Sequence, residues 1–291
     1  MKGIILAGGM GSRLYPSTLS VGKQLLPIYD KPMIYYPLSL VMMAGIKEIL
    51  IITTKKDQLF YMQLLGNGQS LGIKLDYAIQ EKPEGLSQAF MIGRDFIGKD
   101  SVLLVLGDNI LYGDGLISIL KDSKNFVEKE KVAKIFGYKV SNPESFGIIE
   151  LNDNDEIVSL EEKPQDPKSK IASIGIYFYP NEVIDLVKKV NKSSRGEYEI
   201  TSLNQIFLRE SKLHVEILGR GYAWLDTGTP DSMLGASEFV KTIEQRQGYK
   251  IACIEEISFS NGWISKNQLK EIAEPIKNSD YGKYVMELSN E

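Results

Sequence analysis

Cysteine and histidine are nearly absent from this sequence of 291 residues, which contains one of each, Cys253 and His214. A single cysteine leaves no intrachain disulfide to form, which favours a reducing compartment such as the cytoplasm. One Cys and one His far apart in sequence make a weak case for a nucleophile and its base, so Cys253 is more typical of a small core residue. His214 lies where polar and apolar residues alternate, a pattern that predicts a strand and not a metal ligand.

Long apolar runs and an excess of positive charge are also missing. No apolar run approaches the roughly 20 residues that span a bilayer, and Met1 and Lys2 lead straight into a predicted strand without the features of a secretory leader. With 34 Lys and Arg against 38 Asp and Glu, the formal net charge is −4, which weighs against nucleic acid as a partner. We therefore expect a cytoplasmic protein with no membrane and no nucleic-acid partner.

The composition is that of an ordinary globular protein, with 43% hydrophobic and 25% charged residues, which argues against disorder. The length suits one large α/β core or two modest ones. Because no repeat, low-complexity tract or clear linker divides the chain, we predict a single domain over residues 1–291. It comprises an α/β catalytic core over 1–240 and a helical C-terminal extension over 241–291.

Glycines cluster directly after the first predicted strand, where Gly8, Gly9 and Gly11 precede Arg13 and, further on, Lys23. Glycine reaches positive φ cheaply and leaves room for backbone N–H groups to approach an anion. Arg13 offers a planar fork for two phosphate oxygens, and Lys23 offers a point charge that can follow one. The pattern predicts a phosphate site, although a tight strand-to-helix turn with two solvated cations would use the same residues.

Two familiar phosphate loops do not fit these residues. The dinucleotide fingerprint G-x-G-x-x-G could begin at Gly9 and Gly11, but Leu14 stands where its third glycine belongs. The Walker loop could end at Lys23, but Ser17 takes the place of its first glycine. The sequence therefore disfavours a nicotinamide dehydrogenase and a P-loop NTPase.

Apolar runs alternate with helical patterns through the first half of the chain, in the order βαβαβαβ. Runs of Ile, Leu and Val such as 49–52 and 102–106 suit strands buried on both faces, as in a parallel sheet covered by helices. Ligands of such sheets bind at the carboxyl ends of the strands. We therefore expect the glycine loop and the segment 107–109 to share one edge of the sheet. The helices of this half are expected over about 33–44, 58–65 and 86–96.

From about residue 134, strand-like segments with turns at 142–143 and 152–155 predict antiparallel pairing. Helices are expected from near Asn181 and over the ranges 200–210, 232–247 and 266–277. The fold class that follows is α/β: a three-layer αβα fold with a mostly parallel central sheet, an antiparallel part and C-terminal helices.

Two aspartates end predicted strands, Asp108 in LVLGDN and Asp226 in AWLDTGTPDS. Two carboxylates at one edge could share Mg²⁺, which prefers oxygen ligands and usually keeps one or two protein carboxylates beside phosphates and water. Either aspartate alone could equally be a helix cap or a turn residue. Their combination with the phosphate loop favours a metal site.

Three further polar segments are open to more than one interpretation. Glu162 and Lys163 end a predicted strand before a proline, Arg195 lies in a polar loop, and residues 80–85 form a turn-rich loop. The strand end could bind a ligand or be a solvated end with local charge pairing, and the arginine could be an ordinary exposed side chain. The loop 80–85 could contact a base through a side-chain amide and a backbone N–H, or it could merely turn the chain.

Five segments resemble the glucose-1-phosphate thymidylyltransferases, also called dTDP-glucose pyrophosphorylases, in the same order and over essentially the whole chain. These segments are LAGGMGSRLYPSTLSVGKQLLPIYDKPMIYYPLSLVMMAGI, VLGDNILYG, SLEEKP, RGEYEIT and GRGYAWLDTGTPDS. Parts of the first are shared by many sugar nucleotidyltransferases. YYPLS, GDN and GYAWLDTGT together are more similar to the thymidylyl branch than to uridylyl or adenylyl relatives.

The resemblance implies a reaction of dTTP with α-D-glucose 1-phosphate that gives dTDP-glucose and pyrophosphate, the first step of dTDP-rhamnose or related deoxysugar synthesis. Catalytic roles would fall to Arg13, Lys23, Asp108, Lys163 and Asp226, with the cofactor Mg²⁺ on the two aspartates. The nucleotide would contact Gly8, Gly9, Gly11, Ser12, Arg13, Gln24, Gln80 and Gly85. The sugar phosphate would contact Asn109, Gly147, Glu162, Lys163, Tyr177 and Arg195, in the antiparallel part of the fold.

The resemblance also implies an assembly. Relatives form dimers and tetramers, and some bind dTDP-rhamnose as a feedback nucleotide sugar at a subunit interface. We therefore expect a homo-oligomer, in which the helical extension and the region of Trp263 could make such contacts. Trp263 is equally plausible as a core residue.

The residues suit this reaction on chemical grounds. Attack by a sugar phosphate oxygen on an α-phosphorus brings two anions together, so positioning and charge neutralisation lower the barrier without a covalent intermediate. The phosphate nucleophile is ionised at neutral pH and needs no general base. The alternatives are the same chemistry with UTP or another hexose 1-phosphate, and a non-catalytic nucleotide-sugar sensor, which would be expected to lose Arg13, Lys23 or an aspartate.

Overall fold

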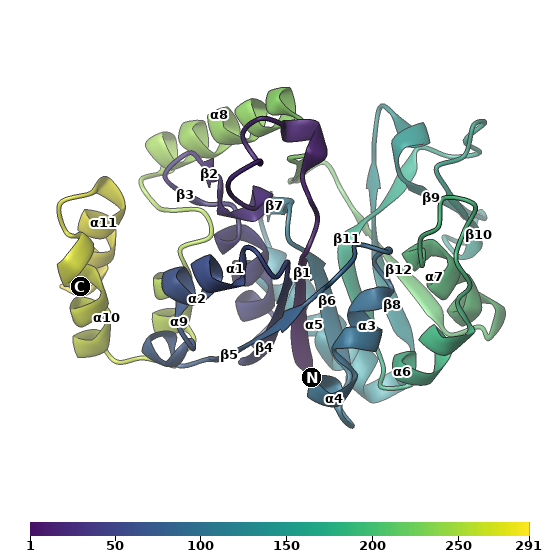
Figure 1. Cartoon of the computed structure of the whole chain (residues 1–291), viewed down its shortest axis with the longest axis horizontal. Helices are drawn as coiled ribbons and strands as arrows, with labels where there is room; N and C mark the ends of the chain where they lie inside the picture. Colours follow the sequence, from purple (N-terminus) through teal and green to yellow (C-terminus); the bar gives the residue numbers. More distant parts are fainter. Residues whose placement is uncertain (291) are drawn as a thin grey trace.

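The first strand, β1 (Lys2–Ala7), lies in the middle of a nine-stranded sheet in the computed structural model, which describes residues 1–290 (Figure 1). On one side β1 pairs in parallel with β4 (Glu48–Thr53), which pairs in parallel with β5 (Lys74–Ile79). On the other side it pairs in parallel with β6 (Val102–Leu106). These strands are nearly continuous apolar runs because both faces of this part of the sheet are covered.

The sheet becomes antiparallel beyond β6, where β11 (Ile171–Tyr179) runs the other way. Two strands pair antiparallel with β11, namely β8 (Ala133–Lys139) and β9 (Gly147–Leu151). The outer strands are β10 (Ile157–Glu162), antiparallel to β9, and β12 (Leu213–Leu218), parallel to β8. The predicted combination of a parallel centre with an antiparallel part is confirmed, and His214 lies in a strand as expected.

Two small antiparallel pairs lie outside the main sheet, beyond the carboxyl end of β1 at the top of Figure 1. One joins β2 (Pro27–Ile28) to β3 (Lys31–Pro32). The other joins β7 (Asn109–Gly113) to β13 (Tyr222–Asp226). The second pair connects segments that are distant in sequence, and it shapes the site described below.

Helices cover both faces of the sheet, which makes the predicted three-layer αβα architecture. Side chains alternate along a strand, so Ile5 faces one core and Ile4 the other. The first core contains residues of α1 (Tyr35–Met43), α2 (Gln58–Leu65) and α5 (Leu116–Glu130). The second contains residues of α3 (Gln88–Ile92), α4 (Arg94–Ile97), α6 (Val183–Leu186) and α7 (Ile200–Arg209).

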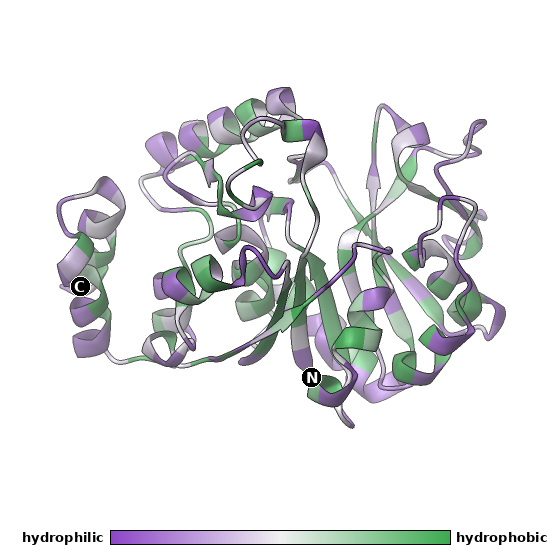
Figure 2. Cartoon of the chain, viewed as in Figure 1, coloured by the Kyte–Doolittle hydropathy of each residue, from purple (hydrophilic) through white to green (hydrophobic). Residues whose placement is uncertain are grey.

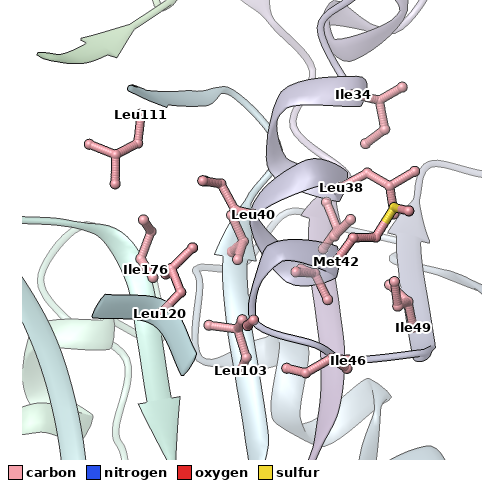
Figure 3. Packing of buried hydrophobic residues seen from close by; sticks show 14 of the residues in the cluster. Ile34, Leu38, Leu40, Met42, Ile46, Ile49, Leu103, Leu111, Leu120 and Ile176 are labelled. Atoms are coloured by element: carbon pink, nitrogen blue, oxygen red, sulfur yellow. The ribbon is translucent and has the colours of Figure 1, made fainter. Parts of the chain in front are cut away.

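The figures show where the apolar residues gather. Figure 2 places the most hydrophobic residues in the central strands, with polar residues on the outer helices and loops. Figure 3 shows the first core, in which Leu40 of α1 lies on the side of Leu103 of β6, and Leu38 and Met42 lie on the side of Ile49 of β4. Six short 3-10 helices complete the described chain: η1 (Ser12–Leu14), η2 (Lys23–Leu25), η3 (Gln69–Leu71), η4 (Pro143–Ser145), η5 (Val187–Lys189) and η6 (Glu274–Ile276).

Two helical segments differ from expectation. The single helix predicted over 86–96 is wrong, because the chain forms α3 and α4 with Gly93 between them. A methyl group on Gly93 would lie 2.7 Å from Ile4 Cδ1, so the missing side chain lets this turn approach β1 closely. Helix α5 was not anticipated, although Leu116, Leu120 and Val127 form a buried stripe along it.

The C-terminal part is helical, as predicted. It contains α8 (Pro230–Gln247), which begins at a capping box of Thr229 and Ser232, and α9 (Ile254–Ser260), which packs on α1. It ends with α10 (Lys266–Ala273) and α11 (Asp280–Leu288), which pack on each other at the left of Figure 1. Cys253 is buried, as expected for a core residue, and Trp263 is partly buried against the first core. None of the helices within residues 1–290 combines the length and the apolarity that crossing a membrane requires.

Candidate active site

The parallel pairing of β1 with β6 brings the glycine loop and Asp108 to the same edge of the sheet. Leu6 lies opposite Leu106, so Gly8 and Asp108 follow neighbouring strands at the same level. The N–H of Gly107 donates to the carbonyl oxygen of Leu6 at 2.9 Å and extends this register beyond β6. The edge predicted from the order of strands and helices is therefore confirmed.

Pairing of β7 with β13 brings the second aspartate to this edge. Asp226, the last residue of β13, lies opposite Asn109, which directly follows Asp108. The hydroxyl of Thr227 donates to the backbone carbonyl of Asp108 at 3.0 Å and ties the two strand ends together. The two aspartates that the sequence separates widely thus lie at adjacent strand ends.

The two cations that follow the glycines lie near these two aspartates. Lys23 Nζ donates to Asp108 Oδ2 at 2.6 Å, and the lysine side chain is buried. Arg13 and Asp226 meet at Gly228, where a methyl group would lie 2.9 Å from the Arg13 guanidinium and 3.2 Å from Asp226 Oδ2. Gly11 has a φ of 60°, which glycine adopts without strain, and it turns the chain into η1, which carries Ser12 and Arg13.

A cavity of about 240 Å³ opens beside Asp108 and is lined by Gly9, Gln24, Gln80, Gly85 and Glu197 among others. Four predicted nucleotide residues therefore share one cavity with a predicted metal ligand. Gly8 lies against Gln80, because a methyl group on Gly8 would come within 2.2 Å of Gln80 Oε1. Gln80 in turn donates through Nε2 to Gln88 Oε1 at 2.6 Å, which orients its amide.

A second cluster gathers around the carboxylate of Glu162. Glu162 lies opposite Gly147 in the pairing of β10 with β9. Its carboxylate accepts from the Thr201 hydroxyl and from the Arg195 guanidinium, the latter at 3.1 Å. Arg195 also donates to Glu199 Oε1 at 2.8 Å, and this carboxylate is buried. Gly147, Glu162 and Arg195, which the resemblance assigns to one sugar phosphate pocket, are thus neighbours.

Lys163 and Tyr177 lie beside this cluster in different environments. Lys163 has a φ of 44°, a left-handed conformation that is uncommon outside glycine, and its N–H donates to the Phe146 carbonyl oxygen at 3.0 Å. Tyr177 is buried within the second core. Burial, together with the Glu162 carboxylate, raises the pKa of the Tyr177 phenol well above its usual range, so this hydroxyl keeps its proton.

Several residues that shape the site escaped the sequence analysis. Trp224 donates through Nε1 to Asn109 Oδ1 at 2.6 Å, and Glu199 and Thr201 hold Arg195 and Glu162. Period-two alternation along β13 places Trp224 on the same face as Asp226, which is a signal available from sequence. The partners of Trp224 and Glu199 depend on tertiary contacts and carry no local signal.

The donors at this edge suit a hard divalent cation. Asp108 and Asp226 supply two carboxylates, and within residues 1–290 no group of three or more His, Cys, Asp and Glu is placed to hold a metal. Two carboxylates without a complete protein cage are what Mg²⁺ usually uses, since it takes its other ligands from phosphates and water. The residues therefore fit a metal that binds together with a phosphorylated substrate.

Comparison with known proteins identifies the class to which this fold and site belong. The family model described as nucleotidyl transferase matches residues 2–243. A UDP-glucose pyrophosphorylase structure complexed with UDP-glucose, 22% identical, has the same fold with a TM-score of 0.71, covering 83% of this chain and 98% of that one. The class is that of the nucleotidyl transferases, which are enzymes.

Relatives of higher sequence identity show to which family of nucleotidyl transferases the chain belongs. Glucose-1-phosphate thymidylyltransferases of Neisseria meningitidis and Mycobacterium tuberculosis are each 52% identical over 99% of this chain and 99% of their own length. A Bacillus anthracis structure assigned to the same enzyme, in complex with a sucrose, is 38% identical with a TM-score of 0.75, covering 82% of this chain and 94% of that one. The chain belongs to the glucose-1-phosphate thymidylyltransferase family.

Gly228 gives a direct test of the Arg13 and Asp226 geometry. We expect Gly228→Ala to lower kcat/KM by about 10²-fold, because displacement of a positioned group by an ångström costs this much. The atom that a methyl group would press on is the end of the flexible Arg13 side chain, so the fold should be preserved. Steady-state kinetics and thermal unfolding measure the two effects.

The matched control is Gly235→Ala in α8, where a methyl group would meet no atom within 4 Å. This variant should keep full activity and stability. Activity of Gly228→Ala equal to that of Gly235→Ala would contradict the placement of Arg13 beside Asp226.

Proposed function

We propose that this enzyme transfers the thymidylyl group of dTTP to α-D-glucose 1-phosphate, giving dTDP-glucose and pyrophosphate with Mg²⁺ as cofactor. One observation carries the proposal: Arg13, Lys23, Asp108 and Asp226 converge at one sheet edge, beside a cavity bordered by Gln24 and Gln80. The names of the relatives that match 99% of the chain support the same substrates.

The glycine loop would hold the triphosphate. Gly8, Gly9 and Gly11 leave room for backbone N–H groups to face phosphate oxygens, and Ser12 and Arg13 follow on η1. Arg13 would grip the departing pyrophosphate through its planar fork, and Lys23 would neutralise the α-phosphate as a point charge. Gln24, Gln80 and Gly85 border the cavity at the position proposed for the base and the deoxyribose.

Asp108 and Asp226 would hold Mg²⁺. The ion, when bound, supplies charge neutralisation for the phosphate oxygens at the reacting centre. The protein's part is to present the two carboxylates from adjacent strand ends and to orient them through the pairing of β7 with β13.

The cluster around Glu162 would hold the sugar phosphate. Glu162 presents acceptor oxygens suited to sugar hydroxyls, and Gly147 lies opposite it, where a methyl group would lie 2.9 Å from the Thr201 hydroxyl oxygen. Lys163 and Arg195 supply positive charge for the phosphate. Tyr177 keeps its proton and can donate from the buried side.

Proximity and charge would account for the chemistry. The sugar phosphate oxygen attacks the α-phosphorus and expels pyrophosphate in one in-line displacement, so no covalent protein intermediate is needed. The nucleophile is an ionised phosphate at neutral pH, which explains a site without histidine: His214, the only histidine of the chain, is exposed on β12.

A substrate panel tests the proposal. Pyrophosphate release should be fastest with dTTP and glucose 1-phosphate among dTTP, UTP, CTP, ATP and GTP combined with several hexose 1-phosphates. UTP is the rival to measure most carefully, because UDP-glucose pyrophosphorylase shares the fold. A preference for UTP, or for another hexose 1-phosphate, would contradict the proposed specificity while leaving the reaction type intact.

Charge removal at the site tests the mechanism. Arg13→Ala and Asp226→Asn should each lower kcat by about 10²–10³-fold, the usual effect of losing one electrostatic donor or ligand in an active site. Arg209→Ala and Asp122→Asn, at exposed positions of α7 and α5, are matched controls and should behave as the wild type. Near-normal turnover of either site variant would remove that residue from the mechanism.

We also propose a cytoplasmic homo-oligomer, a dimer or tetramer, in which the helical extension over 241–291 makes a subunit contact and a feedback nucleotide sugar binds. A cavity of about 550 Å³ supports this, since it is separate from the active site and is lined by Tyr112, Asp114, Tyr249 and Lys250 among others. Tyr249 belongs to the proposed extension, so ligand binding and subunit contact would involve the same segment.

Sedimentation and inhibition kinetics test this assembly. We expect a dimer or tetramer, and inhibition by dTDP-rhamnose that excess dTTP does not overcome. Tyr249→Ala should weaken this inhibition while leaving kcat unchanged, because the cavity lies apart from the reacting groups. A monomer in solution, or inhibition that dTTP fully reverses, would contradict the proposal.

A further inference from the structure

Asn109 lies between the two aspartates of the active site. It directly follows Asp108 and lies opposite Asp226 in the pairing of β7 with β13. Its side chain is buried, with 4% of the residue exposed. The resemblance to relatives assigns Asn109 to the sugar phosphate, but its hydrogen bonds show that most of its polar capacity is used within the protein.

The amide of Asn109 has one orientation that satisfies its neighbours. Its Oδ1 accepts from the indole Nε1 of Trp224 at 2.6 Å and from the backbone N–H of Gly175 at 3.2 Å. Both partners are donors only, so the oxygen has to face them. The amide nitrogen then faces Asp108 and donates to its Oδ1 at 3.2 Å.

The strand β11 is shaped to make this contact. Its pairing with β8 is irregular between Ser173 and Tyr177, which frees the N–H of Gly175 for Asn109. A methyl group on Gly175 would lie 2.6 Å from Asn109 Nδ2, so only glycine permits the approach. Three separate elements, β7, β11 and β13, thus fix one amide group.

We propose that Asn109, held by Trp224 and Gly175, is a positioning residue that orients the Asp108 carboxylate for the metal. This inference rests on the proposed function of Asp108 and Asp226. The other oxygen of Asp108 accepts from Lys23, which has to turn toward the α-phosphate when it acts on substrate. Once Lys23 has turned away, the hydrogen bond from Asn109 to Oδ1 keeps the Asp108 carboxylate in place, with its Oδ2 directed at the cation.

Metal affinity is the measurement that separates positioning from sugar binding. The probe is Mn²⁺, titrated into the whole enzyme in the presence of dTTP and followed by electron paramagnetic resonance, because the metal takes its remaining ligands from a phosphorylated substrate. Asn109→Ala should weaken Mn²⁺ binding by about 10–100-fold, as loss of partners behind a metal ligand usually does. Trp224→Phe keeps an aromatic ring but removes the N–H donor together with part of the indole, and should weaken binding by about 5-fold, the effect of one hydrogen bond.

Tyr138→Phe is the matched control. Tyr138 packs edge-on against Trp224 with ring centroids 6.0 Å apart, and its hydroxyl donates to the Tyr222 carbonyl oxygen, away from Asn109. This variant should bind Mn²⁺ as the wild type does. Thermal unfolding of each variant separates loss of fold from loss of orientation, and Trp224→Phe provides the test if Asn109→Ala fails to fold.

Kinetics give a second readout. In the positioning role, Trp224→Phe lowers kcat and raises the Mg²⁺ concentration needed for activity, while the KM for glucose 1-phosphate stays unchanged. Wild-type Mn²⁺ affinity in both variants, with a raised KM for the sugar phosphate, would overturn the proposal and make Asn109 a sugar ligand.

Asp226→Asn distinguishes failure of this inference from failure of the proposed metal pair. If Asp226→Asn loses Mn²⁺ binding and Trp224→Phe does not, the metal pair stands and the positioning role is wrong. If Asp226→Asn binds Mn²⁺ as the wild type does, the proposed metal pair is wrong, and the role of Asn109 is overturned with it.

Discussion

The pairing of β7 with β13 is the constraint on which the candidate active site depends. This short ladder sets Asp226 opposite Asn109 and therefore beside Asp108, although the two aspartates come from distant parts of the chain. Thr227 reinforces the arrangement by donating to the Asp108 carbonyl oxygen. A slip of the ladder by one residue would turn Asp226 to the opposite face, because side chains alternate along a strand. The register of two five-residue strands thus decides whether the carboxylates can act together.

The rest of the fold supports this small ladder through a buried network of charges. Lys31, in β3, donates to Glu244 of α8 at 2.8 Å and also pairs with Asp30. Lys250 contacts Asp30 and Glu244 at 2.6 and 2.9 Å, so two cations face two carboxylates. Helix α8 follows Asp226 in the chain, and the β2–β3 hairpin follows Lys23. The ion pairs between α8 and the hairpin therefore connect the segment that carries Asp226 to the segment that carries Lys23. Balanced pairing matters because an unpaired buried charge would be costly.

The order of strands and helices could be predicted because the spacing of apolar residues along the chain indicates each element. The sheet edge shared by the glycine loop and Asp108 could also be predicted, since parallel strands run in one direction and end at the same edge. Glycines, cations and aspartates of the site followed from these patterns and from resemblance. The break at Gly93 could not be predicted, since it depends on the closeness of Ile4. The hydrogen bond from Trp224 to Asn109 could not be predicted either, because it depends on the register in which β13 pairs with β7, and no local sequence pattern sets that register.

The arrangement of charges gives a physical reason for the proposed divalent cation. Lys23 Nζ donates to Asp108 Oδ2 at 2.6 Å, and Arg13 and Asp226 both lie close to Gly228. Phosphate oxygens would have to compete with the Asp108 carboxylate for Lys23. A dication held by Asp108 and Asp226 would neutralise both carboxylates and free Lys23 for the substrates. In the proposed site the aspartates would do more than hold the ion, because occupying Asp108 would make Lys23 available to the reacting phosphates.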